Sequence, residues 1–267
     1  MDSLLKIASA ERFLARLVID DDQWVLKGGL NLLARLGPAA RLTRDADLAT
    51  GIARSDVEAR VRAAADRDLG DFLSFQVREP VALDADGEAG GLRFRVDCDL
   101  ADRDVATFNL DVVLTQPATS EVETVELPGL TGFAGLPPVT MRALVPARQI
   151  VEKLHAYTRD YGAQENSRPR DLVDMLALAA AVSFKVAELR RCGSAVFVER
   201  AGRSWPPAIQ APPPGWGLYW DREGRGRHGL PDVDLAGAFG LLDRFWSPVL
   251  DGSLVGSWDP AEWRWSR

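Results

Sequence analysis

The stretch Lys27-Gly28-Gly29-Leu30-Asn31, followed by Arg41-Leu42-Thr43-Arg44-Asp45-Ala46-Asp47, decides the fold of this chain. The paired glycines end a short apolar run and lead into a short helix. Such a turn lets backbone N–H groups approach a phosphate closely. Two aspartates then alternate along the next predicted strand, where residues two apart point to the same face. The order therefore predicts a site for a triphosphate and for the divalent ions that neutralise it.

The spacing Asp-X-Asp alone is weak support for such a site. It recurs at several places among 39 acidic residues, so most of these pairs are solvated surface charge. Only Asp45 and Asp47 lie a short helix downstream of a Gly-Gly turn, with Leu42 and Leu48 flanking them in strand-like alternation. Two carboxylates on one face could reach a pair of ions about 3.5–4 Å apart. Context thus selects Asp45 and Asp47 as the metal-binding pair.

Apolar periodicity predicts an α+β protein. Alternation with period two between 72 and 114, with a turn at 84–91, indicates strands that extend a small mixed sheet. The segment 117–138, rich in Pro, Gly and Thr, is typical of a linker. Strands are also expected at 24–26 and 41–49, and helices at 3–18, 30–36, 146–161, 169–190 and 234–247, with one more beginning at an N-cap on Ser55.

The chain length fits one large domain or two modest ones. We expect a small mixed sheet flanked by helices over 1–138, a helical portion that completes the site over 139–200, and a Trp- and Pro-rich extension over 201–267. The extension could hold an acceptor substrate or a protein partner, or it could bind nothing.

Composition limits the classes of partner. A net charge of -7 and a pI of about 5.0 argue against a broad nucleic-acid surface, although arginines cluster around 142–170 and 190–227. The two cysteines lack metal-site spacing, so we expect both to be structural. No apolar run approaches the roughly 18 residues of a spanning helix, and no apolar signal region opens the chain. We therefore expect a cytoplasmic protein that does not bind membranes.

A third carboxylate is expected from a neighbouring strand, because two-ion chemistry commonly uses one. Asp111 is the candidate, since it interrupts the apolar strand Phe108-Asn109-Leu110-Asp111-Val112-Val113. The alternative is that Asp111 lies on the exposed face of an edge strand.

Further candidates lie on the predicted helices after residue 146. Lys153 falls at the edge of an apolar stripe, so its ammonium could reach a phosphate or could simply extend to solvent beside Glu152. Asp171 follows Pro169 at a helix start, where an acid favours the helix dipole. Asp171 could also form a polar cluster with Arg170 or Lys153 that orients a nucleotide.

Four motifs together resemble the AbiEii/AbiGii-type toxin family of nucleotidyltransferases, in the DNA polymerase β-like superfamily. They are Lys27-Gly28-Gly29, Arg41-X-Thr43-X-Asp45-X-Asp47, Glu152-Lys153-Leu154-His155-Ala156 and Arg170-Asp171-Leu172-X-Asp174. The resemblance covers roughly residues 10–185. It implies a minimal nucleotidyltransferase fold joined to a helical C-terminal portion, a nucleoside triphosphate substrate and Mg²⁺ or Mn²⁺. It also implies a bacterial toxin or phage-defence role, with tRNA as an acceptor and a cognate antitoxin as a partner.

The resemblance assigns roles to residues. Gly28 and Gly29 match the phosphate turn, although many superfamily members have serine at the second position. Asp111 matches only by its place on a strand. The implied catalytic residues are Asp45, Asp47, Asp111, Lys153 and Asp171, with Asp45, Asp47 and Asp111 as metal ligands. The implied nucleotide-binding residues are Lys27, Gly28, Gly29, Thr43, Lys153 and Arg170.

Two other functions stay open on the sequence. The same chemistry could act on a small molecule, as in antibiotic-modifying nucleotidyltransferases, and the acidic pI fits that acceptor slightly better than tRNA. A catalytically silent module could instead grip a partner through its tryptophan-rich C-terminal region. For the leading hypothesis, the sequence predicts that Asp47→Ala or Lys153→Ala abolishes nucleotide transfer and leaves folding intact.

Overall fold

The computed structural model describes residues 2–19, 21–83, 90–162, 166–201 and 205–266, and these form two compact units. The first unit comprises residues 1–37 and 42–144, and the second comprises 38–41 and 145–267. The chain therefore contributes Pro38–Arg41 to the second unit before it returns to the first. The predicted α+β class, a mixed sheet flanked by helices and followed by a helical portion, is confirmed.

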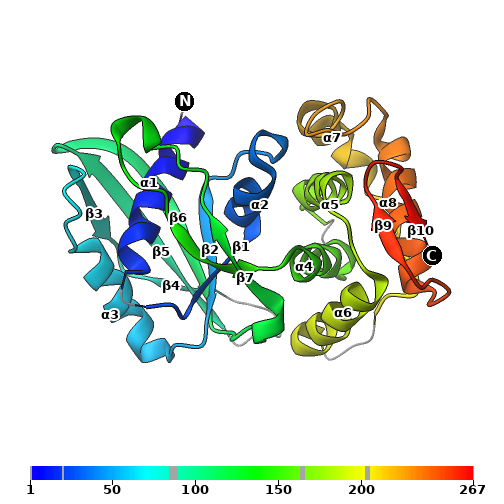
Figure 1. Ribbon diagram of the computed structural model, residues 1–267, viewed down its shortest axis with the longest axis horizontal. Helices are drawn as coiled ribbons and strands as arrows, with labels where there is room; N and C mark the ends of the chain where they lie inside the picture. Colours follow the sequence, from blue (N-terminus) through cyan, green and yellow to red (C-terminus); the bar gives the residue numbers. More distant parts are fainter. Residues whose placement is uncertain (1, 20, 84–89, 163–165, 202–204, 267) are drawn as a thin grey trace. The chain divides into compact units, whose positions relative to one another are not determined.

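A mixed sheet organises the first unit (Figure 1). Its strand order is β3-β5-β6-β2-β1-β8-β7, and β4 pairs with β5 beside this path. Strands β2 and β6 are parallel, as are β1 and β8, whereas the other pairs are antiparallel. The elements are α1 (Asp2–Leu17), β1 (Trp24–Lys27), α2 (Gly28–Leu36), β2 (Asp45–Thr50), α3 (Arg54–Ala65), β3 (Leu73–Val77), β4 (Val81–Leu83), β5 (Gly91–Leu100), β6 (Arg103–Val113), β7 (Val122–Glu126) and β8 (Thr140–Leu144).

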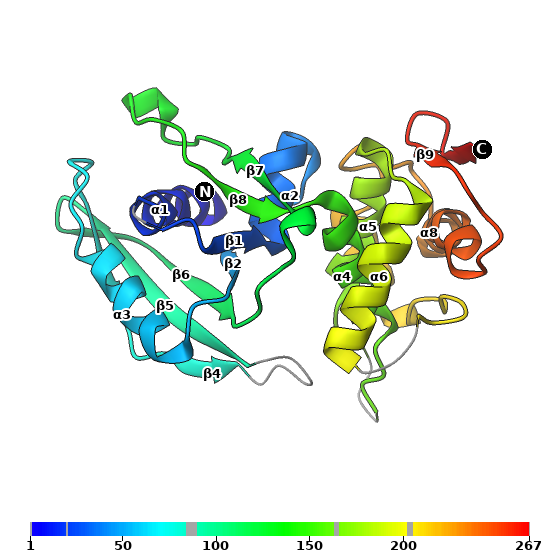
Figure 2. The same cartoon turned by 60° about the horizontal axis from the view of Figure 1, so that its bottom comes forward.

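One face of the sheet carries α1, which in turn contacts α3 (Figures 1 and 2). Phe108 of β6 and Phe75 of β3 pack edge-on against Phe13 of α1, with ring centroids 6.0 and 5.3 Å away. Even-numbered residues of β6 from Ala106 to Val112 are buried, whereas the odd-numbered ones are partly exposed. The opposite face of this strand is therefore polar and partly open.

A buried ion cluster fixes α1 to the chain before β3. Arg16 donates to both oxygens of Asp71 at 2.6 and 3.0 Å, and Arg12 Nε donates to Oδ2 at 2.9 Å. Burial raises the pKa of Asp71, but the bonds from Arg16 and Arg12 outweigh it and lower that pKa to about 2. A buried charge is tolerated when it is paired and hydrogen-bonded in this way.

The second unit is helical, with a small C-terminal hairpin. Its elements are α4 (Pro146–Thr158), α5 (Pro169–Ala181), α6 (Val186–Ala201), α7 (Gly217–Glu223), α8 (Leu235–Leu250), β9 (Ser257–Asp259) and β10 (Arg264–Ser266). Phe245 of α8 contacts the rings of Trp246, Trp258 and Trp265 at centroid distances of 4.9–5.3 Å. The Trp-rich extension thus supplies part of the core of this unit.

Sequence predictions of local structure are wrong at four places, and for the first two the cause is a contact with a later part of the chain. The linker-like segment 117–138 contains β7, which pairs with β8 and packs Val122 against the apolar core. The helix expected at 169–190 ends at Ala181, because Phe184 O accepts from Trp258 N of the C-terminal hairpin at 2.7 Å. The strand expected from Arg41 begins at Asp45. The N-cap of α3 is Ala53 instead of Ser55.

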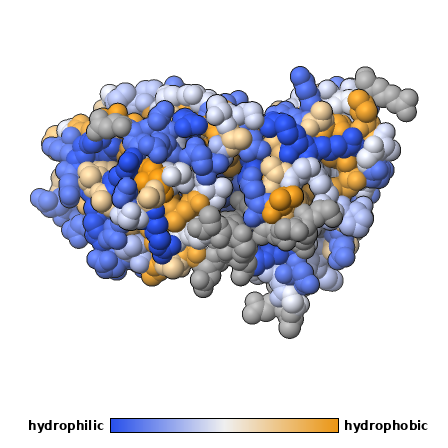
Figure 3. Space-filling view, turned by 90° about the horizontal axis from the view of Figure 1, so that it is seen from below, coloured by the Kyte–Doolittle hydropathy of each residue, from blue (hydrophilic) through white to orange (hydrophobic). Residues whose placement is uncertain are grey.

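The turn predicted at 84–91 lies mostly outside the described residues, and Gly91 opens β5. Both cysteines are buried, in agreement with structural roles. No described helix combines the length and the apolar character needed to span a bilayer. On the face shown in Figure 3, apolar residues are scattered among hydrophilic ones.

Glu11 of α1 generates a prediction about pH. It is 1% exposed, and its Oε2 accepts from the backbone N of Leu130 at 3.0 Å. Burial raises its pKa to about 7, although the backbone bonds from Leu130 and Gly129 oppose the shift. The folded state therefore keeps a proton that the unfolded chain loses above about pH 4.5. This contribution to stability is complete below pH 4.5 and is lost as pH rises through 7, a loss of about 3 kcal/mol.

We expect Glu11→Gln to remove this loss, because the amide oxygen can still accept from Leu130 and does not ionise. The free energy of urea unfolding of the variant, relative to the wild type, should rise between pH 5 and pH 8. Glu126→Gln, an exposed carboxylate of the same unit, is the control and should show no such rise. A flat difference for Glu11→Gln would show that Glu11 is ionised in the folded protein across this range.

Candidate active site

The glycine turn after β1 lies directly against Asp47. Lys27 and Asp47 are partners in the antiparallel β1–β2 ladder, and Gly28 has a φ of 65°. A Cβ on Gly28 would lie 1.9 Å from Asp47 Oδ2, and one on Gly29 would lie 2.7 Å from Thr43 Oγ1. Only glycine fits at both positions without displacing these side chains. Helix α2 begins at Gly28, two residues before the predicted start, so both glycines occupy its first turn.

Thr43 supports this corner from the chain just before β2. Its side chain is buried, and Oγ1 donates to the backbone O of Asp45 at 3.2 Å. Thr43 therefore contacts both Gly29 and Asp45, the first residue of β2. Its predicted contact with a nucleotide stays a prediction.

The register between β2 and β6 places the candidate acids on one face. Asp45 pairs with Asn109, and Asp47 pairs with Asp111, in the parallel ladder. Asn109 Nδ2 donates to Asp45 Oδ1 at 2.9 Å. Because β6 lies between β5 and β2, the alternative that Asp111 sits on an edge strand is excluded.

Arg93 of β5 is a member of this group that the sequence did not predict. It is the register partner of Asp111 across the β5–β6 ladder. Its Nε and Nη2 donate to Oδ1 and Oδ2 of Asp111 at 2.7 and 2.6 Å. Those bonds raise the pKa of Arg93, and the nearby charges of Asp45 and Asp47 add to the shift. The guanidinium thus balances part of the negative charge on this face.

The donor set fits a divalent cation held by two carboxylates. Mg²⁺ characteristically takes one or two protein carboxylates, with waters and substrate phosphates as its other ligands. Asp45 and Asp47 share one face beside the glycine turn. Among the described residues, no three His, Cys, Asp or Glu side chains lie close enough to hold an ion. The third ligand predicted at Asp111 stays a prediction, since both its oxygens accept from Arg93.

The second unit contains a separate buried ion network around α4 and α5. Lys153 Nζ lies 2.9 Å from Asp171 Oδ1 and 2.8 Å from Asp174 Oδ2. Arg41 donates to both oxygens of Asp174, at 2.8 and 3.0 Å. Lys153 therefore does not extend to solvent beside Glu152, and its ammonium is enclosed by carboxylates.

The charges in this network hold one another ionised. Burial alone would lower the pKa of Lys153, but Asp171 and Asp174 raise it above its usual value. Burial alone would raise the pKa of Asp174, but Lys153 and Arg41 lower it. Arg168 Nε also lies 2.9 Å from Asp171 Oδ2, at an angle that makes no hydrogen bond.

The predicted cluster of Asp171 with Arg170 or Lys153 is thus formed by Lys153. Arg170 is exposed on the first turn of α5. Sequence reasoning did not assign roles to Arg41 and Asp174, although both stand in the quoted motifs. Their pairing joins residues 133 positions apart, and no local pattern signals it.

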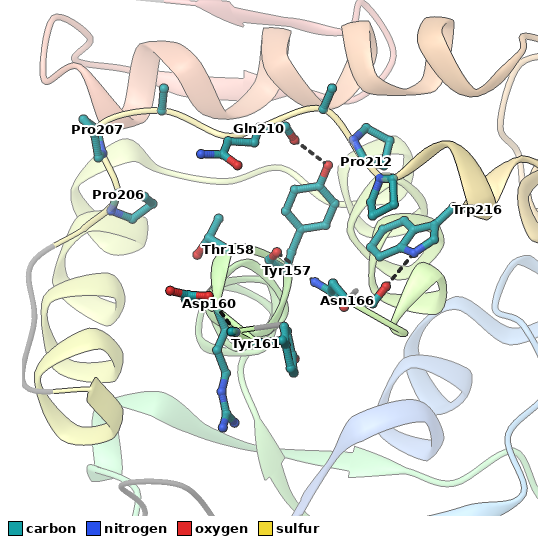
Figure 4. Close-up of a pocket in the computed structure, with 15 residues that line it drawn as sticks. Tyr157, Thr158, Asp160, Tyr161, Asn166, Pro206, Pro207, Gln210, Pro212 and Trp216 are labelled. Atoms are coloured by element: carbon teal, nitrogen blue, oxygen red, sulfur yellow. Dashed lines mark hydrogen bonds between the residues drawn. The ribbon is translucent and has the colours of Figure 1, made fainter. Parts of the chain in front are cut away.

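A pocket of about 620 Å³ lies elsewhere in the second unit (Figure 4). The end of α4 and the proline-containing segment 206–213 form its walls. Tyr157 donates its hydroxyl to Gln210 O at 2.8 Å, and Trp216 Nε1 donates to Asn166 O at 2.7 Å. None of the predicted site residues lines this pocket.

Lys153 generates a prediction about stability. Lys153→Met leaves Asp171 and Asp174 buried with one cation fewer, and breaking a buried ion pair typically costs about 3–5 kcal/mol. We expect the free energy of unfolding, measured by urea denaturation, to fall by about that amount. Lys185→Met removes the same charge at an exposed position of this unit and should change it by less than about 0.5 kcal/mol. Equal values for the two variants would contradict a structural role for Lys153.

Comparison with known proteins identifies relatives of this arrangement. The family model for the nucleotidyl transferase AbiEii toxin of type IV toxin–antitoxin systems matches residues 12–234. The solved structure of MenT4, a nucleotidyltransferase toxin from Mycobacterium tuberculosis H37Rv, is 20% identical, with a TM-score of 0.58 over 98% of this chain and 87% of its own. JHP933 from Helicobacter pylori is 16% identical, with a TM-score of 0.47 over 93% of this chain and 91% of its own. No curated protein matches the sequence.

The likeness to MenT4 concerns the fold, whereas the family match rests on the sequence itself. Residues 12–234 include the glycine turn, Asp45, Asp47 and Asp111 of the first unit. They also include Lys153 and the remainder of the ion network in the second unit. The family model matches most of the length of this chain. The chain therefore belongs to the AbiEii nucleotidyltransferase toxin family and is a nucleotidyltransferase.

Proposed function

We propose that the protein transfers a nucleoside monophosphate from a nucleoside triphosphate to an acceptor hydroxyl, which loses its proton and displaces pyrophosphate, with Asp45 and Asp47 as ligands of Mg²⁺ or Mn²⁺. The close approach of the Gly28 backbone to Asp47 is the observation that carries this proposal. It brings a turn suited to phosphate beside two carboxylates that share a face of β2.

In this mechanism the protein mainly positions and neutralises groups. The backbone N–H groups of Gly28 and Gly29 lie in the first turn of α2, where helical N–H groups favour a phosphate. Asn109 holds Asp45 in place through its amide hydrogen bond. A bound divalent cation would supply charge neutralisation for the phosphates. Asp111, one strand away, would accept a hydrogen bond from the attacking hydroxyl.

The proposal retains the other residues that the family resemblance implies. Lys27 precedes the glycine turn, and Thr43 lies against Gly29. Lys153, Asp171 and Arg170 of the second unit are proposed to contact the triphosphate or to orient such a contact. Since Lys153 also stabilises buried carboxylates, loss of activity in Lys153→Ala would not by itself identify a phosphate contact. The expectation that this variant folds normally is therefore replaced by the loss of stability predicted above.

For the acceptor we propose the tRNA implied by the resemblance, and for the partner a cognate antitoxin. Family membership in type IV toxin–antitoxin systems supports both. A small hydroxylated compound is the alternative acceptor, which the net charge of -7 favours.

Asp45→Asn/Asp47→Asn tests the proposed chemistry. We expect purified wild-type protein with Mg²⁺ and radiolabelled nucleoside triphosphates to label a tRNA-sized band in total bacterial RNA. The double variant should lose at least about 10³-fold in rate, because both proposed metal-binding carboxylates become amides. Gel autoradiography with each of the four triphosphates measures the effect and identifies the nucleotide.

Asp102→Asn/Asp104→Asn provides a matched control. This pair has the same Asp-X-Asp spacing and is exposed, with Asp102 at the turn before β6 and Asp104 in the first residues of that strand. Asn accepts the positive φ of residue 102 as readily as Asp does. Its rate should stay within about twofold of the wild type. An active Asp45→Asn/Asp47→Asn enzyme would refute the proposed role of these residues. Labelling of an added small hydroxylated compound in place of RNA would favour the alternative acceptor.

A further inference from the structure

The side chain of Arg93 forms an ion pair with Asp111. Arg93 donates to both carboxylate oxygens at 2.7 and 2.6 Å, as two parallel charge-assisted hydrogen bonds. Its side chain is 44% exposed, whereas that of Asp111 is 14% exposed. The guanidinium therefore has solvent beside it and can leave Asp111 without breaking any packed core.

The reason for this pair lies in the crowding of like charges. The β2–β6 register sets Asp47 directly across from Asp111, with Asp45 two residues away on the same face. The side-chain amide of Asn109 donates one hydrogen bond to Asp45, and the guanidinium of Arg93 forms an ion pair with Asp111. Both oxygens of Asp111 accept from a residue of β5, the neighbour of β6 on the side opposite β2. This engagement agrees with the lack of a three-carboxylate metal group among the described residues.

We propose that Arg93 competes with a divalent cation for Asp111 and thereby sets the metal affinity of this face. The guanidinium engages both oxygens of the carboxylate that would complete a three-acid site. Arg93 is thus a positioning residue that acts through Asp111. The inference rests on the proposed function only in placing the metal at Asp45 and Asp47.

This competition can be tested by titrating the full chain with Mn²⁺ in the absence of nucleotide. Electron paramagnetic resonance of the free ion measures how much Mn²⁺ is bound. We expect Arg93→Ala to lower the dissociation constant about tenfold, because a difference of about 1.4 kcal/mol in a charge-assisted pair corresponds to that factor. Arg93→Lys should lower it less, since an ammonium keeps the charge but loses the two-pronged geometry. Circular dichroism checks that each variant is folded.

Two further variants separate competition from a general charge effect. Arg95→Ala removes the same charge from an exposed position on the same face of β5 and should change the constant by no more than about twofold. Arg93→Ala/Asp111→Asn should not show the tighter Mn²⁺ binding expected of Arg93→Ala, because the carboxylate released by the first change is then an amide.

An unchanged or weaker Mn²⁺ affinity in Arg93→Ala, or an equal gain in Arg95→Ala, would overturn the proposal. The nucleotide-labelling assay tests the function independently. Transfer activity combined with unchanged Mn²⁺ affinity in Arg93→Ala would refute the competition alone. Tighter Mn²⁺ binding in Arg93→Ala without any nucleotide transfer would support the competition and refute the proposed function.

Discussion

Repulsion between carboxylates on neighbouring parallel strands is the constraint on which the first unit's site depends. The register that pairs Asp47 with Asp111 also buries Ala46, Leu48, Leu110 and Val112 on the opposite face. Shifting either strand by one residue would turn the acids into the core and the apolar residues into solvent. The hydrophobic core therefore enforces a local concentration of negative charge. Counter-charges and amide donors must then come from the same strands and from β5.

The second unit also contains carboxylates whose charge is unfavourable without a cationic partner, in this case because they are buried. Asp171 and Asp174 are almost fully buried, and Lys153 lies within hydrogen-bonding distance of both, while Arg41 pairs with Asp174. The first unit uses the same solution at Asp71, between Arg12 and Arg16. In these two clusters the ions are enclosed, so removing one partner costs more than a surface pair is worth. Around Asp111 the ions are partly open, so exchange of partners is cheaper.

How much the sequence could predict follows from how local each signal is. The glycine turn, the alternation of Asp45 with Asp47 and the helix around Lys153 each rest on neighbouring residues, and the structure forms all three. Strand β7 escapes prediction because Val122 and Val125 give a weak alternation, which pairing with β8 completes. The break after Ala181 depends on a hairpin more than 70 residues later in the chain.

The candidate site divides along the same line. Asp45 and Asp47 can be identified from one short motif, because a strand of period two places them together whatever surrounds it. Arg93 could not be identified, since its importance comes from the β5–β6 register opposite Asp111. An arginine at an alternate position of a strand is otherwise an ordinary surface residue.

The motif that contains both aspartates also has more than one purpose. Arg41, which begins it, belongs to the second unit and pairs with the buried Asp174. The two aspartates at its end instead share the crowded face beside the glycine turn, where a bound metal ion would relieve their mutual repulsion. The proposed chemistry therefore lies with the aspartates at the end of the motif, whereas the arginine that begins it pairs with a buried carboxylate of the second unit.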